Sequence, residues 1–313
     1  MGNADERVPV LYVGGMPRSG STLLDLMLGQ LHGHCGVGEL FYMWLRVERD
    51  LKCACGEPFS QCPFWAKVGE VAYGGWSTVD LQDVYRLQRQ VDATSKLPMI
   101  LAAGLLPGFR RRLDRYTELI TPLYRAIAEV SGARVVVDST KRPSLAYILR
   151  RAPGIDLRLV HILRDPRGVA YSWSQLVELP EGMESRKYMR TRSPALIGRR
   201  WVTVNLMIGA LRWLGVRRVK LRYEDLVRDP RGELTRVGAL TEDAVGGPDT
   251  LTFLSGTTFT PGTLHTVAGG RIRMSRGPIT LALDEKWRRE YKPSTRRLVA
   301  AMTWPLRWFY GYR

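Results

Sequence analysis

A glycine-rich stretch near the start of the chain, VGGMPRSGSTLL at residues 13–24, decides the predicted fold. An apolar run, Val8 to Val13, precedes it, and leucines at helical spacing follow it. This pattern predicts a buried strand, a tight turn and a helix. The backbone N–H groups of such a turn and the positive end of the helix dipole both favour an anion. We therefore expect a phosphate or sulfate group to bind here.

The stretch differs from a nucleotide-hydrolysing P-loop at one position. Gly15 and Gly20 have the G-x-x-x-x-G spacing, but Ser21 stands where the P-loop has its lysine. The nearby cation is Arg18, inside the turn. The missing lysine argues against ordinary ATP or GTP hydrolysis. A turn that only joins strand to helix is the alternative.

Composition limits the choice of ligands and location. The 313 residues carry a net charge of +17, which indicates anionic ligands, nucleic acid or an anionic membrane surface. The basic residues are spread along the chain and no nucleic-acid motif is present, so we expect an anionic cofactor and no nucleic acid. No apolar run reaches the length of a membrane span. The polar residues 1–7 do not resemble a signal peptide, and we expect a cytoplasmic location.

Three of the four cysteines are clustered. Cys53, Cys55 and Cys62 lie in CACG–(x5)–CPFW, and Cys35 is the fourth. They could be thiols, a local disulfide or a zinc site. Zinc would need a fourth ligand, for which Cys35 and His34 are candidates, and the C-x-C spacing is unusual for a zinc finger. A structural role is favoured over a catalytic one.

The whole chain, residues 1–313, is predicted to form one α/β domain. Its strands are separated by helices, which predicts a parallel, doubly wound sheet. Helices predicted at 79–91, 100–113 and 116–130 form an insertion at about 76–131, where acceptor specificity is expected. Residues 178–193 resemble a lid or loop. A nucleotide loop and tail are expected at about 255–313, with an aromatic end that packs on the domain or contacts a membrane peripherally. The four predicted strands are 8–13, 135–137, 157–163 and 216–221.

Four motifs together resemble the sulfotransferases that use 3′-phosphoadenosine 5′-phosphosulfate (PAPS). The turn at 15–24 is similar to the 5′-phosphosulfate loop, and LRDPRGVAYS at 163–172 is similar to the 3′-phosphate motif. RYEDL at 222–226 resembles the segment after the last strand, and the cysteine stretch at 53–65 resembles a pattern of the bacterial branch. The resemblance implies a P-loop-like, three-layer α/β/α fold with a central parallel sheet and a helical insertion.

The resemblance also implies roles at the matching positions. The turn would bind the 5′-phosphosulfate, Arg164 and Ser172 the 3′-phosphate, and Tyr223 would lie near the adenine or the 3′-phosphate. The segment 269–276 resembles the family's basic nucleotide loop only in outline. The expected cofactor-binding residues are Arg18, Ser19, Gly20, Ser21, Thr22, Arg164, Ser172, Tyr223, Gly270, Arg271 and Arg273.

Transfer to a hydroxyl needs a base that takes its proton. Glu39 matches the glutamate base of the branches that act on tyrosine and sugar hydroxyls, and His34 and His32 are its rivals. Lys141 matches a lysine of the tyrosine-sulfating branch that stabilises the transferring group. With Arg18 these are the predicted catalytic residues, and no metal is expected. Helix capping by Glu39 and simple solvation of Lys141 are the structural alternatives.

Two other functions are open. A small-molecule kinase would use ATP-Mg with Asp138 as its acid, but it lacks the loop lysine. A protein that only binds nucleotides or membranes would need neither Glu39 nor Lys141. The acceptor, a hydroxyl on a sugar, lipid, phenol or secondary metabolite, and the oligomeric state are not readable from the sequence.

Overall fold

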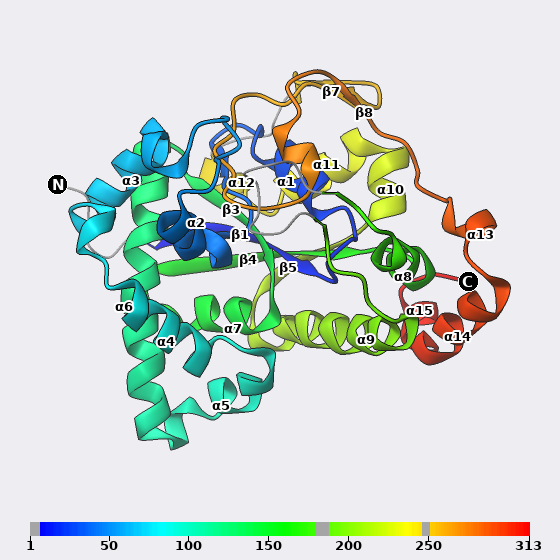
Figure 1. Ribbon diagram of the computed structural model, residues 1–313, viewed down its shortest axis with the longest axis horizontal. Helices are drawn as coiled ribbons and strands as arrows, with labels where there is room; N and C mark the ends of the chain where they lie inside the picture. Colours follow the sequence, from blue (N-terminus) through cyan, green and yellow to red (C-terminus); the bar gives the residue numbers. More distant parts are fainter. Residues whose placement is uncertain (1–6, 179–187, 246–250) are drawn as a thin grey trace.

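Five parallel strands form the centre of the computed structural model, which describes residues 7–178, 188–245 and 251–313 (Figure 1). Their order is β2-β3-β1-β4-β5. The four predicted strands are confirmed, and β2 is a fifth that was not predicted because it has only three residues. The strands are β1 (Val8–Gly15), β2 (His34–Gly36), β3 (Val135–Lys141), β4 (Ile155–Leu163) and β5 (Arg217–Arg222).

Alternate side chains of β1 supply two hydrophobic cores, one on each face of the sheet. Val10 and Tyr12 pack in the core shared with α6 (Pro107–Ser131), α7 (Pro143–Arg151) and α9 (Pro194–Ala210). Leu11 and Val13 pack in the core shared with α1 (Ser21–Leu28), α10 (Tyr223–Arg228) and α11 (Pro230–Gly238). In Figure 1, α7 and α9 lie below the sheet and α1 and α11 above it. The predicted three-layer α/β/α arrangement is confirmed.

The predicted helical insertion is present, with different boundaries. The helix predicted at 100–113 is wrong, because α5 ends at Leu101 and α6 begins at Pro107. Pro122 lies inside α6, where buried Ile120, Leu123 and Tyr124 hold the helix against the core. The helices of this region are α2 (Met43–Arg49), α3 (Pro63–Tyr73), α4 (Leu81–Val91), α5 (Leu97–Leu101) and α6.

The C-terminal segment closes over one end of the domain. Tyr310 donates to the Asn205 carbonyl at 3.3 Å and Tyr312 donates to Glu224 at 2.9 Å, so packing of the tail is confirmed. Trp308 and Phe309 are about two-thirds exposed, and a peripheral membrane contact stays a prediction. The elements here are α12 (Glu242–Val245), β6 (Leu254–Ser255), β7 (Thr258–Phe259), η7 (Arg271–Met274), β8 (Ile279–Thr280), α13 (Trp287–Glu290), α14 (Pro293–Thr303) and α15 (Leu306–Phe309).

Two expectations concern membranes and the lid. None of the helices in the described part of the chain has the length and apolar character that a membrane crossing requires. The predicted lid at 178–193 falls mostly on residues 179–187, which lie outside the described residues.

Candidate active site

The glycine-rich turn lies at the carboxyl end of β1, the edge at which open parallel sheets bind ligands. Gly15 has a φ of 150°, and a Cβ there would meet the Ile162 carbonyl oxygen at 2.2 Å. Gly20 has a φ of 87° and caps the N-terminus of α1. Both positions require glycine, because the backbone of the turn runs against its neighbours.

Three motifs that are far apart in the sequence meet at Gly20. The Tyr223 ring lies so close that a Cβ on Gly20 would meet its Cδ2 at 2.6 Å. The Arg164 guanidinium lies over the same Tyr223 ring, 4.7 Å from its centroid. Arg164 also donates to the Arg18 carbonyl at 3.1 Å. The structure therefore brings together the turn, the end of β4 and the end of β5.

Replacing Gly20 by alanine is expected to weaken anion binding at the turn and to destabilise the fold. The added Cβ displaces Tyr223, and the positive φ alone costs about 1–2 kcal/mol for an L-residue. Gly132→Ala is the matched control, because Gly132 has a φ of 66° and open space around its Cβ position. Thermal unfolding should therefore show a larger loss for Gly20→Ala. Equal losses in the two variants would contradict the close packing of Tyr223.

The hydroxyls of the turn have different surroundings. Ser19 is buried, and among the described residues its Oγ has no hydrogen-bond partner. Thr22 accepts a hydrogen bond at 2.9 Å from the backbone N–H of Gly270. This contact attaches the C-terminal segment to the first turn of α1. Ser21 is buried at the helix start.

Arg18 and Lys141 share an unusual backbone conformation. Their φ angles are 74° and 68°, in the left-handed region that side chains other than glycine avoid. Such strain gathers at functional sites, where the surroundings hold it in place. The Arg18 guanidinium lies 5.3 Å from the Trp173 ring centroid, and the Trp173 indole donates to the Pro17 carbonyl at 3.3 Å. Trp173 thus fixes the turn from α8 (Pro166–Ser174).

Glu39 and Lys141 form an ion pair of 2.8 Å. Lys141 lies at the end of β3, opposite Gly14, and its ammonium also donates to the Ser139 carbonyl at 2.6 Å. The Lys141 side chain is 6% exposed and that of Glu39 is 16% exposed. Lys141 is therefore not a solvated surface lysine. The Glu39 side chain makes no cap hydrogen bond to the short helix that follows it.

Two backbone contacts position Glu39. Ser139 donates to the Gly38 carbonyl at 2.8 Å, and Glu39 donates to the Ala268 carbonyl at 3.3 Å. A Cβ on Gly38 would meet that same Ala268 oxygen at 2.5 Å, so glycine is required there as well. The end of β3 and the C-terminal segment together set where Glu39 lies.

The rival base His34 has other partners. Its Nε2 lies 2.9 Å from the Thr241 hydroxyl, and its Nδ1 lies 2.8 Å from the His32 carbonyl. The His34 ring thus lies beside Thr241, just before α12, whereas Glu39 pairs with Lys141 at the end of β3.

Arg164 makes an ion pair with a residue far along the chain. Its partner is Asp284, at 2.9 Å, whereas Asp165 pairs with Arg167 at 2.6 Å and caps α8. Ser172, half-buried on α8, is next to Trp173. The two predicted 3′-phosphate residues therefore lie on elements that both contact the turn.

The predicted basic loop supplies two arginines with different surroundings. Arg271 is exposed. Arg273 is buried and donates to the carbonyls of Thr266 at 2.8 Å and Lys52 at 3.3 Å. Arg273 therefore holds the segment to the chain before the cysteines, and its contact with a cofactor stays a prediction.

Two buried carboxyl groups lie near the site, and neither is among the predicted catalytic or cofactor-binding residues of the sulfotransferase hypothesis. Asp25 lies on α1, and burial raises its pKa to about 7, an effect that the charge of Lys141 opposes. In the sequence, Asp25 is marked only by being an acidic residue within an apolar helical run. Asp138, the acid of the kinase hypothesis, accepts hydrogen bonds from Tyr124 at 2.6 Å and from the Thr140 N–H and hydroxyl at 2.8 and 2.6 Å. These contacts give Asp138 a structural task.

Comparison with known proteins assigns the chain to a family. The model of the sulfotransferase family matches residues 9–242. The chain belongs to the sulfotransferase family. No curated protein matches the chain.

One solved structure agrees with the fold of this sulfotransferase, and two others are more distantly similar. The sulfotransferase domain of the Synechococcus PCC 7002 olefin synthase is 22% identical over 97% of each chain, with a TM-score of 0.51. The sulfotransferase domain from the curacin biosynthetic pathway is 18% identical over 95% of this chain and 99% of that one, with a TM-score of 0.46. STF1 of Mycobacterium tuberculosis H37Rv is 17% identical over 77% and 68%, with a TM-score of 0.39.

Proposed function

We propose that this sulfotransferase moves a sulfuryl group from PAPS to a hydroxyl of a small-molecule, sugar or lipid-borne acceptor and releases adenosine 3′,5′-bisphosphate. The observation that carries the proposal is the meeting of Arg164 and Tyr223 with the glycine-rich turn. A turn of this kind suits one anionic group, and a second fixed arginine beside it suits a nucleotide with a second phosphate.

The residues present fit such a donor. The buried Ser19 hydroxyl offers an unused donor inside the turn. The N-terminus of α1, Arg18 and the hydroxyls of Ser21 and Thr22 add positive potential and further donors at the 5′ end. Arg164 and Ser172 would hold the 3′-phosphate, and Tyr223 would lie beside the adenine or this phosphate.

PAPS, when bound, supplies a sulfuryl group on a good leaving group, the 5′-phosphate. Glu39 would accept the proton of the acceptor hydroxyl, so that the hydroxyl oxygen could take the sulfuryl group as adenosine 3′,5′-bisphosphate leaves. Lys141 places its ammonium where negative charge develops, and Arg18 adds to this stabilisation. The 2.8 Å pair holds the two groups next to each other before the acceptor binds.

A thermal-shift experiment tests the proposal against the kinase hypothesis. Adenosine 3′,5′-bisphosphate should stabilise the protein by about 2.7 kcal/mol at one hundred times its Kd. ATP-Mg should shift the melting temperature less at the same concentration. Selective stabilisation by ATP-Mg would contradict the proposal and favour a kinase.

The helical insertion and the basic surface are the features we assign to acceptor choice. The net charge of +17 favours an acidic or lipid-borne acceptor. A library of hydroxyl compounds, incubated with PAPS and screened by mass for sulfated products, identifies the class. A cytoplasmic location and a peripheral membrane contact remain part of the proposal.

A further inference from the structure

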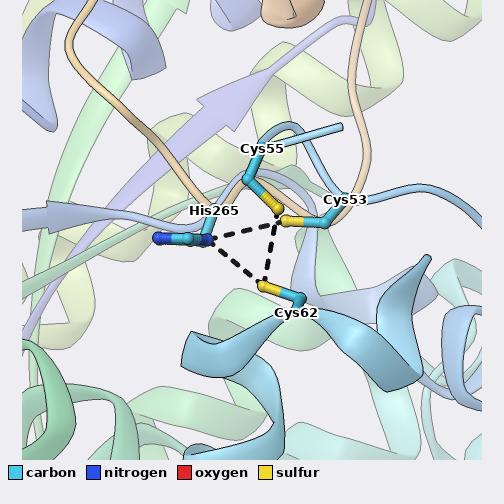
Figure 2. A group of neighbouring side chains, drawn as sticks. All are labelled: Cys53, Cys55, Cys62 and His265. Carbon is cyan, nitrogen blue, oxygen red and sulfur yellow. Dashed lines mark hydrogen bonds between the residues drawn. The ribbon is translucent and has the colours of Figure 1, made fainter. Parts of the chain in front are cut away.

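Three cysteines and one histidine from two distant segments point toward one another (Figure 2). Cys53, Cys55 and Cys62 lie between α2 and α3, and His265 lies more than two hundred residues later in the chain. Their sulfur and nitrogen atoms all lie within 4.8 Å of one another. The fourth group is thus His265, not Cys35 or His34 as the sequence suggested. His34 contacts Thr241 instead.

The distances within this cluster are close to those of a tetrahedral metal site. Cys62 Sγ lies 3.2 Å from His265 Nδ1 and 3.7 Å from Cys55 Sγ, and Cys53 Sγ lies 3.9 Å from His265 Nδ1. Zinc binds thiolate sulfur at about 2.3 Å and imidazole nitrogen at about 2.0 Å, which places neighbouring ligand atoms about 3.6–3.8 Å apart. Thiolates with one imidazole are the donor set that zinc prefers.

The surroundings of the cluster also favour a metal site. Cys53 and Cys62 are buried, and all four cysteines of the chain are free thiols. The Phe64 ring stacks on the His265 ring, with centroids 4.8 Å apart, and the Trp65 indole donates to the His265 carbonyl at 2.8 Å. The stacking fixes the plane of the imidazole, and the Trp65 hydrogen bond fixes the backbone of His265.

We propose that Cys53, Cys55, Cys62 and His265 bind one zinc ion. Four protein ligands fill the tetrahedron, which is the pattern of structural zinc sites, whereas catalytic sites keep one position for water or substrate. The ion therefore adds no step to sulfuryl transfer. Its task is to join the cysteine segment to the C-terminal segment that begins at His265.

This second segment, residues 265–276, contacts the candidate active site. Val267 donates to the Val37 carbonyl at 2.8 Å, and the Ala268 carbonyl accepts from Glu39. Two residues later, Gly270 donates to Thr22. One zinc ion at the start of this segment thus restrains both the backbone of Glu39 and the first turn of α1. This part of the inference rests on the proposed function.

Further hydrogen bonds run between the same two segments. Arg276 donates to the Ala54 carbonyl at 2.7 Å, and the Ala54 N–H donates to the Thr266 carbonyl at 3.3 Å. Arg273 contacts Lys52 and Thr266 as described above. Hydrogen bonds thus already hold the two segments together around the cluster. The metal ion would add a further link between them.

Zinc content of the full-length protein tests the site directly. Protein purified in buffer without chelator should carry about one zinc per chain, as four ligands define one site. Titration of the unfolded metal-free protein with an alkylating agent should then count four thiols. Protein that carries no zinc as purified, although all four thiols are reduced, would overturn the proposal, and so would a disulfide among Cys53, Cys55 and Cys62.

Matched variants assign the ligands. Cys62→Ser and His265→Asn should lower zinc affinity at least about ten-fold, which is the usual cost of disturbing a metal site. Cys35→Ser is the control, because Cys35 is a thiol outside the cluster and should keep full zinc. Cobalt(II) in place of zinc should give the intense visible absorption of a tetrahedral thiolate site. Full zinc in both ligand variants, or a cobalt spectrum without these bands, would contradict the assignment.

The link to the active site is measured on wild-type protein with and without its metal. Removing zinc should weaken binding of adenosine 3′,5′-bisphosphate at least about five-fold, the lower end of usual coupling between two sites. Zinc binding with unchanged bisphosphate affinity would overturn the link and leave the metal site standing. Zinc binding without any bisphosphate binding would instead overturn the proposed function.

Discussion

Replacing Glu39 by glutamine is expected to lower kcat by about 10²- to 10⁴-fold, the usual contribution of a general base. Glutamine keeps the size of the side chain and can accept from Lys141, but it cannot take the acceptor's proton. Affinity for adenosine 3′,5′-bisphosphate should stay within about two-fold, since an interaction specific to the transition state is lost. Steady-state kinetics and titration calorimetry on one preparation give both numbers.

His34→Gln is the control for this experiment. His34 contacts Thr241 and His32, away from the Glu39–Lys141 pair, so turnover should remain near the wild-type value. The opposite outcome, with full turnover in Glu39→Gln and a large loss in His34→Gln, would make His34 the base. Full turnover in both variants would remove both residues from this role.

Replacing Arg18 by alanine is expected to lower both turnover and binding of the bisphosphate. A hydrogen bond to a charged group is worth about 1.5–3 kcal/mol, or about 10- to 150-fold in Kd. Turnover should fall further, by about 10²- to 10³-fold at saturating donor, because charge at the turn increases in the transition state. Alanine carries the same positive-φ cost as arginine at this position, so the comparison isolates the guanidinium.

Two further variants show whether the effect of Arg18→Ala comes from the guanidinium in the turn or from the loss of a positive charge. Arg18→Lys keeps the charge but loses the planar fork, so its Kd should fall between those of wild type and alanine. Arg49→Ala removes an exposed arginine of α2 and should leave the Kd unchanged. If Arg49→Ala weakens binding as much as Arg18→Ala does, the effect belongs to the net charge of the surface and not to the turn.

The parts of the site that follow from local pattern could be predicted from sequence. The strand, glycine-rich turn and α1 are contiguous, and each glycine that the turn needs is visible at its spacing. Arg164 could be placed for a similar reason, because the end of a predicted parallel strand lies at the same sheet edge as the turn. Glu39 and Lys141 were each named from the resemblance alone, and their ion pair was not predicted.

The parts that depend on tertiary packing could not be predicted. His265 reaches the cysteines across two hundred residues, and nothing near it in the sequence marks it as a ligand. Asp284 pairs with Arg164 across a sequence separation of 120 residues, so this contact could not be predicted either. Strand β2 is too short for its own pattern to be seen.

Titration calorimetry with adenosine 3′,5′-bisphosphate and with adenosine 5′-monophosphate tests the central claim most directly. The two nucleotides differ only in the 3′-phosphate that we assign to Arg164 and Ser172. The account predicts about 10- to 150-fold tighter binding of the bisphosphate, the value of one or more charged hydrogen bonds. Equal affinities for the two nucleotides would contradict it.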